Sequence, residues 1–267
     1  MKNLLIRSLT GIIFVVAILG SLLFNRYIFL FLFFVFTIAG LLEFYSLSEK
    51  TGAKPQKVMG ILTGIIVYSI NAIINVFGDM EWLLTIIPFV FSIFIFELYR
   101  KSERPFNNIA YTLLGIIYVA VPFSFMTYYT NVIFKYILLG FFILIWTNDT
   151  FAYLTGMALG KHRLFERISP KKSWEGSIGG AIFALLAGYI LSIYFQILTM
   201  EQWLIFSGIV IITGTFGDLT ESMFKRSIDI KDSGSILPGH GGILDRFDAT
   251  IMAAPFIFTF LKLFTSR

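Results

Sequence analysis

The sequence lacks cysteine altogether and contains little charge. Because cysteine is absent, disulfides, thiolate zinc sites and cysteine nucleophiles are excluded, and any metal must be held by oxygen or histidine ligands. Only 14% of the 267 residues are charged, whereas globular domains contain about 25%. The mean hydropathy is +0.82. A soluble hydrophobic core is therefore a poor explanation for this composition.

Apolar stretches of roughly 20 residues recur along the whole chain, and each is long enough to cross a hydrocarbon core of about 30 Å as a helix. We therefore predict an all-α polytopic integral membrane protein with nine transmembrane helices. The predicted spans are Leu9–Phe24, Tyr27–Leu47, Val58–Phe77, Trp82–Tyr99, Ile109–Thr127, Lys135–Leu159, Glu175–Gln196, Gln202–Ser222 and Phe247–Phe264.

The first apolar run follows Lys2 and Arg7, an arrangement that a signal peptide could also have. No small-residue cleavage site follows before Tyr27, so we predict that the first span is retained. We expect an N-terminal region of five spans at 1–134 and a C-terminal catalytic membrane region of four spans at 135–267.

The basic residues predict the orientation in the membrane. With the N-terminus in the cytoplasm, 17 of the 21 Lys and Arg residues fall in cytoplasmic segments, and the C-terminus lies outside. The net charge of +5 therefore requires no nucleic-acid partner. We interpret the basic residues of the early cytoplasmic loops as topological markers: Lys50, Lys54, Lys57, Arg100, Lys101 and Arg104.

Two later cytoplasmic loops, 160–176 and 225–246, are long and polar, and they flank spans seven and eight on the same side. They can therefore build one site. Four polar residues share one face near the C-terminal end of span eight: Asp218, Glu221, Ser222 and Lys225. The helix dipole disfavours carboxylates at that end unless a cation joins them, and a metal ion would supply the missing charge.

At the start of span nine, by contrast, the dipole favours the carboxylates of Asp245 and Asp248. The glycines at 239, 241 and 242 allow backbone amides to approach an anion. Carboxylates for a metal together with several bases are the ingredients for binding a magnesium-bridged polyphosphate. The alternative is that these charges pair as interhelical salt bridges.

Three further features are less specific. We expect His240 to be a hydrogen-bond donor to the turn or to a phosphate instead of a metal ligand. Asp149 on span six shares a face with Ala152, Gly156 and Gly160, so it is either an additional site residue or a hydrogen-bonded packing residue. The small-residue ridges on spans six and seven are also compatible with a homodimer.

The polar residues of the last loop resemble the C-terminal signature of the phosphatidate cytidylyltransferases, also called CDP-diacylglycerol synthases. The matching positions are Ser222, Lys225, Arg226, Lys231, Asp232, Gly234, Leu237, Pro238, His240, Gly241, Gly242, Asp245, Arg246, Phe247 and Asp248. The segments "DTFAYLTG" and "SPKKSWEG" resemble upstream parts of the same family. These motifs cover 146–248, and the N-terminal half agrees only as a set of membrane spans.

The resemblance implies that CTP and phosphatidate react to give CDP-diacylglycerol and pyrophosphate in the presence of Mg²⁺. It is also compatible with a second bound cation. No covalent enzyme intermediate is needed, because phosphatidate carries its own phosphate nucleophile. The implied catalytic residues are Asp218, Lys225, Arg226, Asp245 and Arg246, with Asp218, Asp245, Glu221 and Asp248 as metal ligands. The implied substrate-binding residues are Lys171, Lys172, Ser222, Lys231, His240, Gly241 and Gly242.

Two other functions are less consistent with the sequence. A CDP-alcohol phosphotransferase would need an array of aspartates along one helix, which is not present. A cation-coupled transporter would gather polar groups near the bilayer midplane, whereas these lie at helix ends and in loops. We therefore expect an enzyme of phospholipid biosynthesis in the bacterial cytoplasmic membrane, with its active site facing the cytoplasm.

Overall fold

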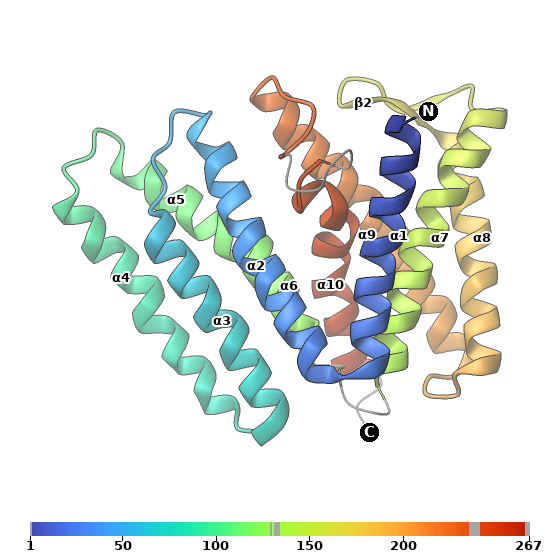
Figure 1. The fold of residues 1–267 in the computed structure, drawn as a ribbon, viewed down its shortest axis with the longest axis horizontal. Helices are drawn as coiled ribbons and strands as arrows, with labels where there is room; N and C mark the ends of the chain where they lie inside the picture. Colours follow the sequence, from blue (N-terminus) through green and yellow to red (C-terminus); the bar gives the residue numbers. More distant parts are fainter. Residues whose placement is uncertain (1, 129, 131–133, 235–240, 265–267) are drawn as a thin grey trace. The chain divides into compact units, whose positions relative to one another are not determined.

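The structure, a computed structural model, describes residues 2–128, 130, 134–234 and 241–264, without the side chains of residues 2–9. Helices dominate it (Figure 1). Its elements are α1 (Lys2–Phe24), α2 (Arg26–Glu49), α3 (Lys57–Phe77), η1 (Met80–Thr85), α4 (Ile86–Tyr99), α5 (Pro105–Gly115), η2 (Ile116–Ala120), α6 (Val121–Phe125), α7 (Lys135–Leu159), β1 (Arg163–Phe165), β2 (Ser169–Ser173), α8 (Trp174–Tyr194), α9 (Met200–Ser227) and α10 (Leu244–Phe264).

The predicted fold class is confirmed. Among the described residues, eight helical segments are long and apolar enough to cross a membrane, and α1 adds a shorter apolar stretch at Thr10–Phe24. Each of the nine predicted spans overlaps one of these segments. The fifth is continuous through η2, where a single π-helical turn links α5 to α6. The protein is an all-α polytopic integral membrane protein.

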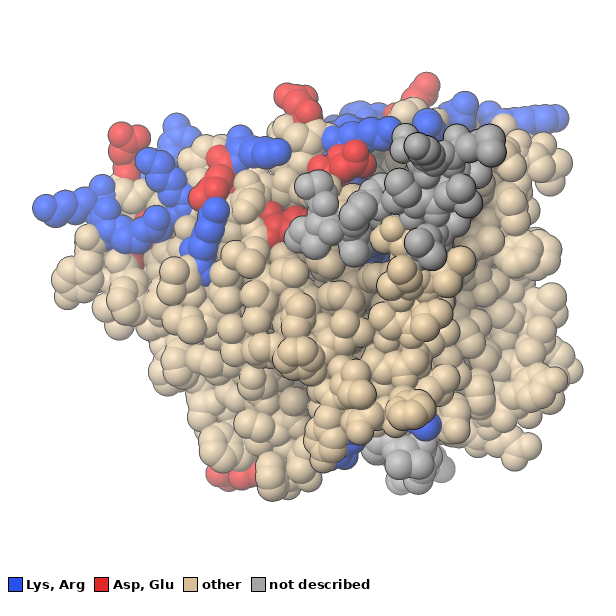
Figure 2. Space-filling model, in the orientation of Figure 1, with Lys and Arg blue, Asp and Glu red and all other residues tan. Residues whose placement is uncertain are grey.

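The chain divides into two compact units. One consists of Met1–Thr130 with Ile228–Phe247, and the other of Asn131–Ser227 with Asp248–Arg267. The described residues of the segment Ile228–Phe247 thus belong to the first of these units. In each unit, the Lys and Arg side chains visible in Figure 2 gather mainly at one end of the helices.

In the N-terminal unit, α2 packs against α1, α3 and α5. Its core is strongly aromatic: the rings of Phe33 and Phe123 each make an edge contact with that of Phe247. The buried Tyr45 hydroxyl donates to the carbonyl of Thr112 at 2.9 Å, which ties α2 to α5. These contacts fix α2 as the central helix of this unit.

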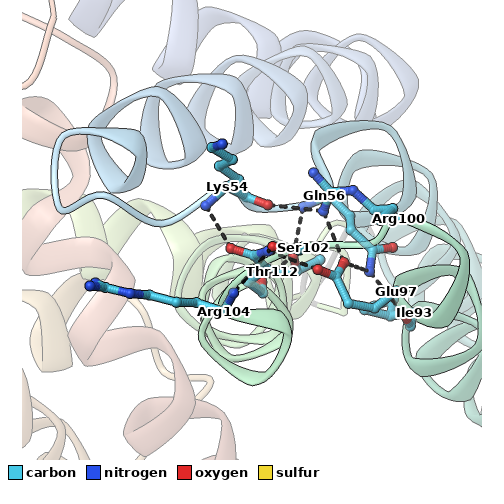
Figure 3. Close-up of polar contacts among 9 residues, drawn as sticks. Lys54, Gln56, Ile93, Glu97, Arg100, Ser102, Arg104 and Thr112 are labelled. Carbon is cyan, nitrogen blue, oxygen red and sulfur yellow. Dashed lines mark hydrogen bonds and ion pairs between the residues drawn. The ribbon is translucent and has the colours of Figure 1, made fainter.

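A buried polar network closes one end of the same unit (Figure 3). The carboxylate of Glu97, which is 3% exposed, accepts hydrogen bonds from Asn108 (2.7 Å) and Gln56 (2.7 Å). Arg100 forms an ion pair with it at 2.9 Å. The Gln56 backbone in turn donates to the hydroxyl of Thr112. The connection before α3 is thereby joined to α4 and α5, and the donors around Glu97 satisfy its buried carboxylate.

In the C-terminal unit, α7, α8 and α9 pack side by side (Figure 1). Trp203 on α9 is fully buried, and its indole N–H donates to the carbonyl of Phe195 at 2.9 Å. Helix α10 approaches α9 closely at Gly217, where a Cβ atom would overlap the backbone carbonyl of Asp248. A small residue is therefore required next to Asp218.

The polar segment between α7 and α8 folds as an antiparallel hairpin of β1 and β2, with Arg163 opposite Ser173. Ser173 is also the N-cap of α8, because its hydroxyl accepts from the backbone N–H of Gly176. The Glu175 carboxylate accepts from the backbone N–H groups of Lys161 and His162. Both ends of the hairpin are thus fixed to the first turn of α8.

Candidate active site

In the C-terminal unit, the carboxylate of Asp248 is within electrostatic reach of three other charged side chains. Asp218 lies near the end of α9 and Asp248 lies on the facing turn of α10, which the close approach at Gly217 permits. The Asp248 carboxylate interacts electrostatically with those of Asp218 and Asp149 and with the ammonium of Lys172. We call Asp149, Lys172, Asp218 and Asp248 the acidic cluster.

The hairpin supplies the cation of this cluster. Lys172 is on β2, and its Nζ atom lies 2.7 Å from Oδ2 of Asp218. The two side chains are 27% and 38% exposed, so the ion pair lies at the solvent boundary of the unit. The neighbouring Lys171 is exposed. Of the two adjacent lysines, Lys172 therefore makes the ion pair with the cluster.

The predicted polar face of α9 is formed, and its members contact one another. The Ser222 hydroxyl donates to Asp218 at 3.3 Å. Glu221 and Lys225 form an ion pair at 2.5 Å, with side chains only 4% and 11% exposed. Lys225 is mostly buried, whereas Arg226 is exposed. This ion pair lies within α9, so it is not one of the interhelical salt bridges of the alternative interpretation.

Asp245 belongs to the N-terminal unit. One of its carboxylate oxygens, Oδ2, accepts hydrogen bonds from the backbone N–H groups of Ser233 and Gly242, both at 2.9 Å. The Gly242 amide, which was expected to approach a substrate anion, therefore contacts a carboxylate of the protein itself. Gly241 has φ of 81°, a conformation that favours glycine. Asp218 and Asp245 lie in different units, so their pairing by one metal ion stays a prediction.

The remaining predicted residues are at the surface or outside the described part. Lys231 and Arg246 are exposed. His240 lies outside the described residues. Within the residues that the structure describes, no three Asp, Glu or His side chains are grouped closely enough to form a ready-made metal site. The Asp218 and Asp248 carboxylates nevertheless have the donor chemistry that Mg²⁺ prefers, and the ammonium of Lys172 lies beside Asp218.

Sequence reasoning missed one acidic residue. Glu43 lies in the second predicted span and is 6% exposed, and its carboxylate accepts hydrogen bonds from residues about 200 positions later. An ionisable residue within a membrane span is itself a signal of function. That signal was present in the sequence, but spacing along one helix could not show which loop Glu43 contacts.

Taken together, the fold and the acidic cluster define a membrane-spanning protein with charged side chains gathered from α7, β2, α9 and α10. Comparison with known proteins identifies the family: residues 5–264 match the model of the Cytidylyltransferase family. The chain therefore belongs to that family, whose members are CTP-dependent nucleotidyltransferases.

Curated relatives cover almost the whole chain. A protein named phosphatidate cytidylyltransferase from Staphylococcus aureus (strain COL) is 34% identical over 256 residues, which is 94% of this chain and 96% of the relative. Proteins of the same name from Staphylococcus saprophyticus and Staphylococcus epidermidis (strain RP62A) are 33% and 34% identical, each with the same coverage. The resemblance predicted from the signature is confirmed.

Proposed function

We propose that this protein is a phosphatidate cytidylyltransferase that converts CTP and phosphatidate into CDP-diacylglycerol and pyrophosphate. The observation that carries the proposal is the acidic cluster, in which Lys172 and Asp218 form a partly exposed ion pair beside Asp248 in a membrane-embedded unit. A site at the end of membrane helices suits one lipid substrate and one soluble substrate. The names of the relatives supply the substrate pair.

In the proposed reaction, a phosphate oxygen of phosphatidate forms a bond to the α-phosphorus of CTP. The bond between that phosphorus and the oxygen bridging to the β-phosphorus breaks, and pyrophosphate leaves with the electron pair. The nucleophile is already anionic, so no side chain has to act as a nucleophile. The protein must neutralise and align two polyanions so that attack and departure are in line.

The basic residues have two different proposed roles, phosphate binding and structural support. We assign phosphate binding to Lys172, which can exchange its Asp218 partner for a phosphate oxygen, and to the exposed Arg226, Lys231 and Arg246. Lys225 is held by Glu221, and we assign to it a supporting role at the end of α9.

We assign the divalent cation to Asp218 and Asp248, with Asp149 within electrostatic reach of Asp248. When bound, Mg²⁺ would neutralise phosphate charge and stabilise the charge that develops during transfer. Carboxylate oxygens are suitable ligands for it. The concentration of negative charge around Asp248 supports this assignment.

We further infer that the site faces the cytoplasm of a bacterial inner membrane, with the N-terminus inside and the C-terminus outside. The asymmetric distribution of basic residues supports this orientation. CTP is a cytoplasmic metabolite, so the same orientation would give the enzyme access to its soluble substrate.

The position of the ³²P label in CTP provides a direct test of the proposed reaction. The purified protein in mixed micelles containing phosphatidate should transfer label from [α-³²P]CTP into lipid and release label from [γ-³²P]CTP as pyrophosphate. Micelles in which diacylglycerol replaces phosphatidate are the control and should incorporate nothing. Lipid labelled by the γ-phosphate would indicate a lipid kinase and would contradict the proposal.

A further inference from the structure

The buried carboxylate of Glu43 joins α2 to both ends of the loop before α10. Its Oε2 atom accepts from the backbone N–H of Ile243 at 2.8 Å, and its Oε1 atom accepts from that of Leu244 at 3.1 Å. Oε1 also accepts a short hydrogen bond from the Ser233 hydroxyl. Glu43, Ser233, Ile243 and Leu244 all belong to the N-terminal unit.

A second carboxylate, that of Asp245, also accepts hydrogen bonds from this loop. It accepts from the backbone N–H of Ser233, whose side chain donates to Glu43, so one residue is held by two carboxylates. The backbone N–H of Gly242 also donates to Asp245. Two carboxylates therefore receive five hydrogen bonds from the two ends of one loop. We call Glu43, Ser233 and Asp245 the loop clasp.

The two adjacent glycines make this close approach possible. A Cβ atom at Gly241 would overlap the Asp245 carboxylate, and one at Gly242 would overlap that of Glu43. Glycine is therefore required at both positions by the protein's own carboxylates. This explains a part of the loop that the sequence analysis attributed to substrate binding.

Glutamate is also specifically required at position 43. A carboxylate has two acceptor oxygens, whereas the amide of glutamine has one acceptor and would point an N–H₂ group at backbone donors. The donors at Ile243 and Leu244 belong to the start of α10, where the helix dipole favours an anion. The negative charge of Glu43, and not only its size, thus stabilises this end of α10.

We propose that Glu43 is a positioning residue for cytidylyl transfer: it holds the ends of the loop and the first turn of α10 in one arrangement. The inference rests on the proposed function. The first turn of α10 carries Arg246, to which phosphate binding is assigned, so an error in the placement of this turn would misplace that charge. Glu43 itself need not touch a substrate.

Amide hydrogen exchange of the protein without substrates tests the structural half of the proposal. In Glu43→Gln, the amides of Ile243 and Leu244 should exchange faster than in the wild type, while amides in the middle of α2 should not change. Ser233→Ala, which removes one donor and leaves the carboxylate in place, is the milder second variant should Glu43→Gln fold poorly. Unchanged exchange in both variants would overturn the proposal.

Kinetics test the functional half. Misplacement of reacting groups lowers turnover by roughly a hundredfold without weakening substrate binding equally, so kcat of Glu43→Gln should fall while KM for phosphatidate changes little. Glu43→Asp keeps the charge and should recover part of kcat. A residue needed only for packing would give the opposite order, because Gln has the size of Glu and Asp does not.

Glu97 provides the matched control. It is equally buried in a span of the same unit, and its carboxylate also has three donors, on Gln56, Arg100 and Asn108. Glu97→Gln should lower the melting temperature but keep kcat within about twofold at a temperature where the protein is folded. An equal loss of kcat in Glu97→Gln and Glu43→Gln would show that Glu43 acts only through stability and would overturn the proposal.

The labelled-CTP assay distinguishes a failure of the positioning role of Glu43 from a failure of the proposed function. A wild-type protein that transfers no label from CTP to phosphatidate contradicts the proposed function, and the exchange measurements then still decide whether Glu43 holds the loop. An active wild type with an equally active Glu43→Gln variant contradicts only the positioning role. A double mutant of Glu43→Gln and Ser233→Ala should show non-additive losses of kcat, because both residues act through one contact.

Discussion

The ammonium of Lys172 lies 2.7 Å from the carboxylate of Asp218, and this ion pair connects the hairpin between α7 and α8 to the end of α9. Because both side chains are partly exposed, the pair itself contributes little to stability. It does place a cation within electrostatic reach of one further carboxylate, that of Asp248. We therefore regard Lys172 as part of the active site and not merely as a marker of membrane orientation.

The first prediction compares the two adjacent lysines. Lys172→Gln should lower kcat/KM for CTP by about a hundredfold, because a charged phosphate contact is worth several kcal/mol in transition-state stabilisation. Lys171→Gln removes the same charge at an exposed position, so it should lower kcat/KM for CTP by less than about fivefold. Steady-state incorporation of labelled CTP measures both variants. Equal losses in the two variants would indicate a diffuse effect of positive charge.

The second prediction concerns the two basic residues at the end of α9, Lys225 and Arg226. Lys225→Ala leaves the buried carboxylate of Glu221 without its ion-pair partner, and such a loss costs about 3–5 kcal/mol of stability. Arg226→Ala removes an exposed charge, so it should raise the CTP concentration required while the melting temperature stays unchanged. Thermal unfolding in detergent, measured beside the activity, distinguishes these effects.

A double mutant tests whether Lys225 stabilises the protein by neutralising Glu221. If Lys225 acts by neutralising Glu221, then replacing both by apolar residues should restore much of the stability that Lys225→Ala loses. Stability that falls further in the double mutant would show that the two side chains contribute independently. That outcome would contradict the interpretation of Glu221 and Lys225 as a structural ion pair.

Most of the fold followed from the sequence, because hydrophobic length is a strong signal in a membrane protein. The predicted spans correspond to the observed helical segments, and the spacing of Asp218, Ser222 and Lys225 correctly placed them on one face of α9. The hydrophobic pattern could not show the hairpin between α7 and α8, whose strands are only three and five residues long.

The contacts of the acidic residues were harder to predict, since helical spacing gives neighbours on one helix and not the partner on another. Glu43 contacts a loop 200 residues later, and Asp245 contacts that same loop. Lys225 follows the eighth predicted span, and its ion pair with Glu221, one turn earlier, leaves it mostly buried. Tertiary packing determines such pairings.

The third prediction tests the orientation. A reporter inserted after Lys172 should be on the cytoplasmic side, and a reporter fused to the C-terminus should be on the opposite side, because the basic loops are expected to remain in the cytoplasm. Paired alkaline phosphatase and fluorescent-protein fusions report the two sides. Both reporters on one side would contradict a nine-span arrangement.

The last prediction concerns the charge of Asp248, which lies near two other carboxylates. Asp248→Asn keeps the size of the side chain but removes a negative charge that Asp218 and Asp149 repel. Without divalent cations, this variant should therefore melt at a higher temperature than the wild type. If Asp248 binds Mg²⁺, its activity should nevertheless fall by about a thousandfold, because a charged ligand near the transferring phosphate is lost.

The response to Mg²⁺ alone separates a cation ligand from a merely crowded carboxylate. Binding to the folded state raises the melting temperature, so the wild type should be stabilised by added Mg²⁺ and Asp248→Asn much less. Asp229→Asn is the matched control: Asp229 is exposed and has φ of 55°, a conformation that Asn also adopts, so stability, activity and the Mg²⁺ response should all stay at wild-type values. An Asp248→Asn variant that keeps both its activity and its Mg²⁺ response would remove Asp248 from the proposed cation site, and the cluster would then be an electrostatic contact centred on Lys172 and Asp218 alone.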